Sequence, residues 1–236
     1  VTGGASGIGR ATAHRLVADG VAVVVGDIQD ETGEAAAAEF RATGGSASYV
    51  HLDVADETSW QQAVSAIERE HGRLDILVNN AGIGDVEPLE QTSLETYSRV
   101  VAITQTSVFL GMKATAELLK QSGAGAVVNV SSIFGIVGGF GVSPGYAAAK
   151  GAVRTLTKNV ALLWATQGVR VNSVHPGFID TAILGEADRE TLVDVTPMRR
   201  LGTPAEVAEA IVFLASPAAS FITGAELWVD GGYLAR

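Results

Sequence analysis

The chain has 236 residues, of which 47% are hydrophobic, 18% are charged and 28 are glycine. This length suits one large α/β domain with a complete core and is too short for two comfortable domains. The net charge of -10 argues against a nucleic-acid partner, because contacts with a phosphate backbone depend on clustered Lys and Arg. We therefore predict a single domain over residues 1–236.

The chain contains neither cysteine nor a membrane-spanning run. Without cysteine there are no disulfides and no thiolate metal sites. The most hydrophobic region, residues 126–142, is broken by Asn129, two serines and several glycines, so it lacks the uninterrupted length that a bilayer requires. We expect a soluble, cytoplasmic protein with no membrane partner. Because the chain starts at Val1 without Met, we also expect the first strand to begin before it, which leaves a targeting signal open.

A glycine-rich turn opens the first predicted helix. Residues 2–9 read Thr-Gly-Gly-Ala-Ser-Gly-Ile-Gly and lead into an amphipathic pattern over residues 10–17. Small residues let the backbone approach a pyrophosphate, and the free N–H groups and dipole of a helix N-terminus attract its charge. A plain loop is the alternative, but the position before a helix favours phosphate binding.

The next predicted strand ends in an acid. Residues 21–27 form a continuous apolar run that closes with Asp27, which is typical of a buried parallel strand. Asp27 follows Gly9 by 18 residues (27 − 9), close to the spacing of about twenty at which an acid binds the adenosine ribose hydroxyls. Because a carboxylate repels a 2′-phosphate, Asp27 favours NAD over NADP. A turn shared with Asp30 is the alternative.

Helical and strand patterns then alternate, with helices expected over about 31–42 and 60–70 and strands over about 47–52 and 75–78. This alternation indicates right-handed βαβ units and a parallel sheet that binds ligands at the carboxyl ends of its strands. Two of these ends carry Asp53-Val54 and Asn79-Asn80-Ala81-Gly82. Asp53 could bond an adenine amino group and the second motif could line a dinucleotide cleft, although each could also be turn chemistry.

A tyrosine and a lysine lie four residues apart on a later helix. A helical pattern over about 94–120, a buried strand over 126–130 and Ser131-Ser132 precede a glycine-rich loop, after which a helix carries Tyr146 and Lys150. Residues at this spacing share a helix face. A free phenol has a pKa of about 10, and a close cation could supply most of the shift of roughly three units that a base near neutrality needs. The same spacing also fits an interfacial Tyr beside a solvated Lys.

The helix that carries Tyr146 is apolar on more than one side. One stripe contains Val153, Leu156, Val160 and Leu163, and further apolar residues elsewhere are Ala148, Ala152 and Leu162. A helix that is apolar on several faces needs a second burial surface. We therefore expect a homo-oligomer, either a tetramer or a dimer.

The last third of the chain predicts strands over 169–174 and 227–229, with a capped helix from Thr203-Pro204 to about 215 between them. His175-Pro176-Gly177 follows the first of these strands. Histidine titrates near neutrality, but we assign His175 a structural role beside Pro176. Residues 182–200 lack strong periodicity, and we predict a mobile substrate lid there.

In their order, these motifs resemble those of the short-chain dehydrogenase/reductase family across essentially the whole chain. The resemblance is carried by the turn at 2–9, Asn79-Asn80-Ala81-Gly82, Ser132 with Tyr146 and Lys150, Pro176-Gly177 with Thr181, and Asp230-Gly231-Gly232. Each motif is modest alone, but their joint order is specific. The resemblance implies an α/β fold, a three-layer, doubly wound Rossmann-type parallel sheet of about seven strands, with the first strand truncated before Val1.

The resemblance also implies roles for individual residues. Tyr146 would exchange a proton with the substrate oxygen while hydride moves between the substrate and nicotinamide. Lys150 would lower the phenol pKa and hold the nicotinamide ribose, and Ser132 would hydrogen-bond the substrate oxygen. Ser132 could instead cap a strand end, and Thr181 could cap the lid rather than orient the carboxamide. The implied cofactor-binding residues are Gly3, Ser6, Gly7, Ile8, Gly9, Asp27, Asp53, Val54, Asn80, Ala81, Gly82, Tyr146, Lys150, Pro176, Gly177, Ile179 and Thr181.

One position departs from the family pattern. The long helix of the family usually carries an Asn whose side chain holds a water that relays protons from the lysine, and alignment on Val108-Phe109 places Thr104 there. A hydroxyl is shorter and offers one donor, whereas an amide offers two donors and a carbonyl. We hypothesise that the relay survives in altered form, through Thr104 or an extra water.

We therefore predict an oxidoreductase that transfers a hydride between NAD(H) and a secondary alcohol or ketone. Apolar residues expected around the site favour an apolar, alicyclic or steroid-like substrate, and these are Phe134, Ile136, Val137, Phe140, Val142, Phe178 and Leu184. One alternative is a 3-oxoacyl-thioester reductase, which Asp27 disfavours because those enzymes usually take NADPH. The other is a non-catalytic NAD-binding sensor or scaffold, as the absent Asn would suggest. Four scattered histidines give no metal-ligand spacing, so we expect no metal.

Overall fold

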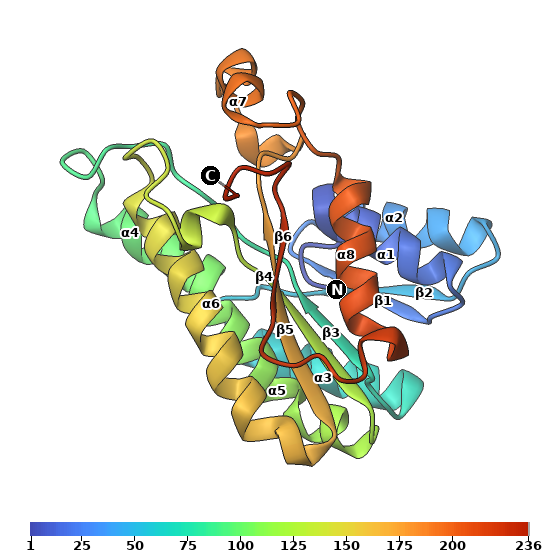
Figure 1. The fold of residues 1–236 in the computed structure, drawn as a ribbon. Helices are drawn as coiled ribbons and strands as arrows, with labels where there is room; N and C mark the ends of the chain where they lie inside the picture. Colours follow the sequence, from blue (N-terminus) through green and yellow to red (C-terminus); the bar gives the residue numbers. More distant parts are fainter. Residues whose placement is uncertain (236) are drawn as a thin grey trace.

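The computed structural model describes residues 1–235 as alternating strands and helices (Figure 1). The strands are β1 (Val23–Asp27), β2 (Ala47–His51), β3 (Ile76–Asn79), β4 (Gly125–Val130), β5 (Val169–Pro176) and β6 (Glu226–Val229). The α-helices are α1 (Gly7–Ala18), α2 (Asp30–Ala42), α3 (Glu57–His71), α4 (Leu94–Val101), α5 (Ser107–Gln121), α6 (Pro144–Trp164), α7 (Arg189–Val195) and α8 (Pro204–Ala215). A π-helical turn, η1, spans Ala102–Thr106, and the 3₁₀ turns are η2 (Ile133–Gly135), η3 (Ala165–Gln167), η4 (Ala182–Leu184) and η5 (Pro217–Ala219).

All strand pairs are parallel, and residues 1 and 2 join two groups of strands. β1 pairs with β2, and the other group has the order β3-β4-β5-β6. The Val1 carbonyl accepts from Gly26 N at 2.9 Å, and Thr2 N donates to the Val78 carbonyl at 3.0 Å. The order across the whole sheet is therefore β2, β1, residues 1–2, β3, β4, β5, β6. Of the roughly seven strands expected, six are full strands, and residues 1–2 occupy the remaining place at the point where the strand order reverses.

Continuous apolar runs explain why the central strands were predicted well. All six residues of β4 are buried, and Val127 and Val128 are fully buried. A strand covered on both faces shows no polar alternation, because both sets of its side chains enter a core. The predicted and observed ranges of β2, β3, β4 and β6 agree within one residue at each end, whereas β5 continues two residues further, to Pro176.

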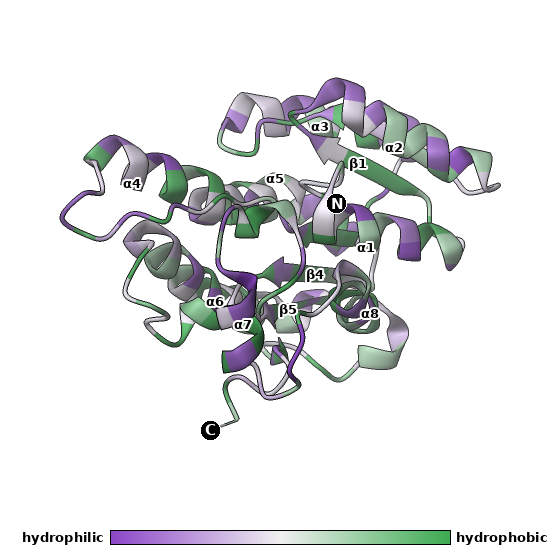
Figure 2. Ribbon diagram, turned by 90° about the horizontal axis from the view of Figure 1, so that it is seen from above, coloured by the Kyte–Doolittle hydropathy of each residue, from purple (hydrophilic) through white to green (hydrophobic). Residues whose placement is uncertain are grey.

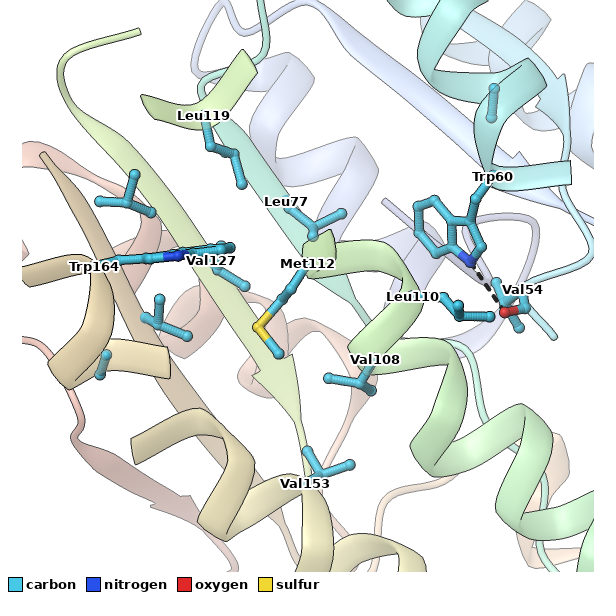
Figure 3. Packing of buried hydrophobic residues seen from close by; sticks show 14 of the residues in the cluster. Val54, Trp60, Leu77, Val108, Leu110, Met112, Leu119, Val127, Val153 and Trp164 are labelled. Carbon is cyan, nitrogen blue, oxygen red and sulfur yellow. Dashed lines mark hydrogen bonds between the residues drawn. The ribbon is translucent and has the colours of Figure 1, made fainter. Parts of the chain in front are cut away.

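Helices cover both faces of the sheet, which gives three layers. On one face α1, α2 and α8 pack on the strands, and α1 and α8 lie side by side (Figure 2). On the other face α3, α5 and α6 enclose a core that includes Trp60, Met112 and Trp164 (Figure 3). The indole of Trp60 donates to the Val54 carbonyl at 3.0 Å, so this large side chain is buried with its polar atom satisfied.

Two predicted segments differ from the structure. The helix expected over 94–120 is interrupted by η1, where Thr104 is fully buried and turns its hydroxyl toward a neighbouring loop. The segment expected as an irregular lid over 182–200 contains η4 and α7, and Asp188 caps α7 by accepting from Glu190 N at 3.1 Å. A helix of 7 residues is too short for its periodicity to stand out from the sequence.

Within residues 1–235, no helix is both long and apolar enough to cross a membrane. In the same part of the chain, no three His, Cys, Asp or Glu side chains lie close enough together to hold a metal ion.

Candidate active site

A cavity of about 570 Å³ opens at the carboxyl ends of the strands, on both sides of the point where the strand order reverses. Ligands of doubly wound sheets bind at such a point. The lining includes nearly all of the predicted site residues, namely Gly3, Ser6, Gly7, Ile8, Asp27, Asp53, Val54, Asn80, Ala81, Gly82, Ser132, Tyr146, Lys150, Pro176, Gly177, Ile179 and Thr181. Gly9 and Thr104 are the two predicted residues that do not line it.

The glycine-rich turn forms one wall of this cavity and leads directly into α1. Gly3 and Gly7 have φ angles of 61° and 51°, in the left-handed region that side chains rarely adopt. A Cβ at Gly9 would collide with the Gly3 carbonyl oxygen, which explains why Gly9 is needed although it does not face the cavity. Ser6 caps α1 without a side-chain bond, so the N–H groups of the first turn remain oriented for an anion.

Asp27 and Asp53 lie at the edge of the cavity beside the glycine-rich turn. Asp27 is 7% exposed, and its carboxylate accepts from Ala5 N at 3.0 Å and from Gln29 N at 3.1 Å. The acid at the end of β1 is thus tied to the turn that precedes α1. Asp53 accepts from Ala55 N at 2.9 Å and so forms a turn, which was the alternative to adenine binding. It also lines the cavity.

Thr2 organises the turn from the opposite side, which the sequence did not reveal. Its hydroxyl accepts from Asn80 N and from Ala81 N, both at 3.0 Å. The Asn80 side chain donates back to the Thr2 carbonyl at 3.0 Å. These bonds fix the end of β3 against the glycine-rich turn. The Asn80 side chain thus shapes the cavity wall by bonding to the backbone of that turn.

Tyr146 and Ser132 meet in the cavity. Ser132 follows β4, accepts from Phe134 N at 3.1 Å and hydrogen-bonds the Tyr146 hydroxyl. Burial raises the pKa of Tyr146, and the bond from Ser132 opposes this by lowering it. Burial dominates, and Lys150 does not offset it here, because its ammonium lies 5.6 Å from the centre of the phenol ring and is engaged elsewhere. The lowering of the phenol pKa by Lys150 stays a prediction.

Lys150 is a buried cation held by the backbone. It is 3% exposed, and Nζ donates to the Val130 carbonyl at 2.7 Å. Burial lowers the pKa of Lys150 to about 8, because an ammonium loses its hydration there. Its own carbonyl accepts from the Ser131 hydroxyl at 2.9 Å, which fixes this turn of α6 against the end of β4.

Thr104 braces the loop that follows β3. Its hydroxyl donates to the Ile83 carbonyl at 2.9 Å and accepts from Ile83 N at 3.0 Å. A Cβ at Gly82 would lie 3.5 Å from both Lys150 Nζ and Thr104 Oγ1, so the two side chains flank the same loop. The only hydrogen of the Thr104 hydroxyl is already donated to Ile83, and a relay through this group stays a prediction.

His175 contacts the backbone of the predicted catalytic serine. Its ring is fully buried, Nε2 lies 2.8 Å from the Ser173 hydroxyl, and Nδ1 lies 3.3 Å from the Ser132 carbonyl. Burial lowers the pKa of His175 to about 4, so the ring is neutral near pH 7. We assigned His175 a structural role beside Pro176. In the structure the same ring also contacts the backbone of Ser132.

The segment after β5 closes the cavity. Gly177 N donates to the Val229 carbonyl at 2.9 Å, and a Cβ at Gly177 would lie 2.8 Å from Asp230 Cα, so the terminal Asp-Gly-Gly motif requires a glycine here. Further along, Thr181 faces the glycine-rich turn, because a Cβ at Gly7 would lie 3.5 Å from its methyl group. The predicted nicotinamide segment and the predicted phosphate turn are therefore neighbours.

Aromatic residues line the other end of the cavity. Phe178 packs on Phe134 and Phe140 with ring centres 5.9 and 6.0 Å apart, and Tyr233 adds an edge contact at 5.3 Å. Of the apolar residues predicted for this region, Phe134, Phe140, Val142, Phe178 and Leu184 line the cavity, whereas Ile136 and Val137 do not. Further lining residues that the sequence did not single out are Asp85, Val86, Arg99, Ile183 and Leu192. They come from loops and helix ends that carry no motif.

Comparison with known proteins identifies the family. A family model described as enoyl-(acyl carrier protein) reductase matches residues 3–234. A cyclopentanol dehydrogenase of Comamonas sp. (strain NCIMB 9872) is 45% identical over 241 residues, covering 100% of this chain and 96% of that protein. A cis-4-hydroxycyclohexanecarboxylate dehydrogenase of Sinomonas cyclohexanicum is 46% identical over 239 residues, with 100% and 95% coverage.

A solved structure agrees with these relatives. The crystal structure of a levodione reductase superposes with a TM-score of 0.94 at 36% identity, and it covers 100% of this chain and 96% of its own. Fold, motif order and cavity all agree with this likeness. The chain belongs to the short-chain dehydrogenase/reductase family of oxidoreductases, whose dehydrogenases act on CH–OH groups with NAD(P) cofactors.

Proposed function

We propose that the protein is an NAD(H)-dependent dehydrogenase of apolar, alicyclic secondary alcohols, and a reductase of the matching ketones. One observation carries this proposal: Ser132, Tyr146 and Lys150 share a single cavity with the glycine-rich turn at one end and an aromatic cluster at the other. The polar end suits a dinucleotide and the aromatic end suits an apolar ring. The relatives named for cyclopentanol and a hydroxycyclohexane substrate support the same substrate class.

The residues at the polar end fit a dinucleotide. The left-handed Gly3 and Gly7 leave space for a pyrophosphate at the N-terminus of α1. Pro176, Gly177, Ile179 and Thr181 would hold the nicotinamide end, where the bound cofactor supplies the hydride acceptor or donor. Asp27 would bind the adenosine ribose hydroxyls, and its charge would repel a 2′-phosphate. On this basis we assign NAD rather than NADP.

The side chains at the centre of the cavity would handle the proton. Ser132 would donate a hydrogen bond to the substrate oxygen from the position at which it hydrogen-bonds the Tyr146 hydroxyl. Tyr146 would take the hydroxyl proton during alcohol oxidation and return it during ketone reduction. Lys150 would stabilise the phenolate through its charge, which its pKa of about 8 leaves largely intact at neutral pH.

NADH absorbance with a panel of cyclic secondary alcohols and ketones tests this function. Tyr146→Phe should lower kcat/KM by about 10²–10⁴-fold, the usual contribution of general acid–base catalysis, while NAD still binds. Tyr97→Phe is the matched control: this tyrosine is 38% exposed and does not line the cavity, so its loss should leave the rates unchanged.

Three other outcomes would contradict parts of the proposal. A preference for NADPH would overturn the assignment of NAD. Turnover restricted to 3-oxoacyl thioesters would replace the alicyclic substrate class. NAD binding with no turnover across the whole panel would indicate a sensor or scaffold.

A further inference from the structure

We propose that Asp85 selects the substrate by accepting a hydrogen bond from a second donor group on its ring, either a hydroxyl or an amine. This inference rests on the proposed dehydrogenase function and names a narrower substrate class within it. The expected substrates are cyclic diols, hydroxyketones or amino alcohols rather than plain cycloalkanols.

Asp85 lies at the substrate end of the cavity, close to the reacting centre. The preceding residue, Gly84, is so near the phenol that a Cβ there would lie 3.6 Å from Tyr146 Cδ2. The Asp85 carbonyl accepts from the hydroxyl of Ser143, which stands at the start of the helix that carries Tyr146. Asp85 lines the same cavity as Phe140 and Val142 and is remote in sequence from the glycine-rich turn.

The carboxylate of Asp85 has no partner of its own. Both side-chain oxygens are shielded from solvent, and neither takes a hydrogen bond from residues 1–235. Shielding an unpaired carboxylate is costly, and an ionised carboxylate only accepts hydrogen bonds. A turn of the side chain toward the cavity that Asp85 lines would let a donor on a bound molecule remove this cost.

Two cations, Arg99 and Lys150, line the same cavity, and neither fills this role. Lys150 donates to the Val130 carbonyl, and the side chain of Arg99 is exposed with no ion pair to Asp85 among the described residues. Apolar side chains that line the same cavity include Phe134, Phe178 and Leu192. Asp85 therefore adds a carboxylate acceptor to a largely apolar lining, which is how a site distinguishes a ring that carries a donor from one that does not.

The charge of Asp85 also sets what the cavity rejects. A substrate with a carboxylate on the ring would place two negative charges close together in a poorly solvated space. This chain should therefore disfavour 4-hydroxycyclohexanecarboxylate, although a relative 46% identical to it is named for the cis form of that compound.

The test compares kcat/KM for cyclohexane-1,4-diol, 4-aminocyclohexanol, cyclohexanol and 4-hydroxycyclohexanecarboxylate in the NAD-dependent assay. The wild type should prefer the diol or the amino alcohol over cyclohexanol by about tenfold or more, the size expected for a hydrogen bond to a charged group. Asp85→Ala should abolish this ratio and Asp85→Asn should reduce it. Asp85→Asn should also improve use of the carboxylate several-fold, a change that a merely structural role would not produce.

Control variants separate Asp85 from its surroundings. Glu90→Gln removes the same charge from the same loop at an exposed position outside the cavity and should leave every ratio unchanged. Arg99→Met should keep the diol preference. If that preference is lost in Arg99→Met and kept in Asp85→Ala, recognition belongs to Arg99 and the proposal is wrong.

The failure of this inference differs from the failure of the proposed function. Equal turnover of diol, amino alcohol and cyclohexanol by the wild type overturns the role of Asp85 and leaves the dehydrogenase assignment intact. If no compound is turned over, calorimetric binding of the same four compounds to the NAD-loaded protein decides the question. An affinity ratio that does not respond to Asp85→Ala then overturns the proposal.

Discussion

Lys150 and His175 are both buried bases near the carboxyl end of β4, and burial acts on them in the same direction. It lowers the pKa of Lys150 from 10.5 to about 8 and the pKa of His175 from 6.5 to about 4. The consequences at pH 7 are opposite, because Lys150 remains mostly charged whereas His175 is neutral. Lys150 therefore keeps its charge at a cost in stability, whereas His175 contacts the Ser132 carbonyl as a neutral ring.

Lys150→Met should abolish activity without destabilising the protein at pH 7. A lowering of 2.5 pKa units (10.5 − 8) corresponds to about 3 kcal/mol that the folded state loses by burying the charge. Losing the bond to the Val130 carbonyl costs about 1–2 kcal/mol, so the variant should unfold with an unchanged or slightly higher free energy. Urea denaturation at pH 7, alongside the NADH assay, measures both effects.

The lowered pKa of Lys150 also makes the free energy of unfolding depend on pH. Between pH 8 and 10.5 the unfolded chain binds more protons at this residue than the folded one, so its cost should fade as the pH rises through that window. Lys113→Met is the control, since Lys113 is exposed and pairs with Glu57 at the surface. A Lys150→Met variant less stable than wild type by more than about 2 kcal/mol at pH 7 would contradict the argument.

His175 should make the protein less stable in acid. With a folded pKa of about 4 and an unfolded pKa near 6.5, the unfolded chain binds more protons below pH 6.5. About 3 kcal/mol should be lost as the pH falls from 6.5 to 4, because burial opposes charging more than nearby Glu226 favours it. Denaturant titrations at pH 7, 5.5 and 4.5 measure this loss. In His175→Gln this part of the slope should disappear, and an unchanged slope would show that other groups cause it.

At the scale of elements, the π-helical turn η1 sets the direction of the Thr104 side chain. The turn directs Thr104 at Ile83, where one hydroxyl satisfies both a backbone N–H and a carbonyl. Insertions of this kind inside helices often occur at functional sites. Here η1 supports the loop that carries Gly84 and Asp85 past Tyr146.

Thr104→Val should therefore destabilise the protein and slow catalysis together. Valine keeps the shape but leaves two polar groups of Ile83 without partners, at a cost of about 2–4 kcal/mol. Thr115→Val is matched in burial and chemistry, but Thr115 only donates to a carbonyl within α5, so it should cost less than about 1 kcal/mol. Thermal unfolding and kcat of the two variants decide the matter. Equal effects would mean that Thr104 has no special part in bracing the loop.

The elements that the sequence predicted well are those whose pattern depends on burial or capping alone. Central strands appear as apolar runs, and α8 starts with a capping box between Thr203 and Glu206. The turn η1 was missed because residues 102–106 carry no sequence signal that distinguishes a π-helical turn from an α-helix. The raised pKa of Tyr146 was missed because burial of a side chain depends on several distant elements. Asp85 was missed because an acid in a loop is usually solvated, and only the fold shows that this one is shielded.

At the scale of the whole molecule, the parallel sheet explains why the order of the motifs was informative. Every strand ends at the same edge, so residues after β1, β3, β4 and β5 line one cavity although they are spread from Asp27 to Thr181. Interfaces between subunits have no comparable series of sequence motifs. They have to be inferred from apolar side chains that lie exposed on the surface of the single chain.

The helices α4, α5 and α6 expose such side chains and lead to our last prediction, that the protein is a homo-oligomer. Leu162 and Leu163 on α6 are 82% and 63% exposed, Leu94 on α4 is 80% exposed, and Phe109 on α5 is 49% exposed. A stable interface buries about 1,200–2,000 Å², and its centre is rich in such residues.

Light scattering should therefore give a dimer or a tetramer. Leu162→Glu with Leu163→Glu should dissociate it and lower the thermal midpoint, because oligomerisation stabilises by mass action. Ala35→Glu, on the exposed side of α2, adds charge away from these helices and should change neither property. A wild-type protein that remains monomeric at all concentrations would contradict the prediction.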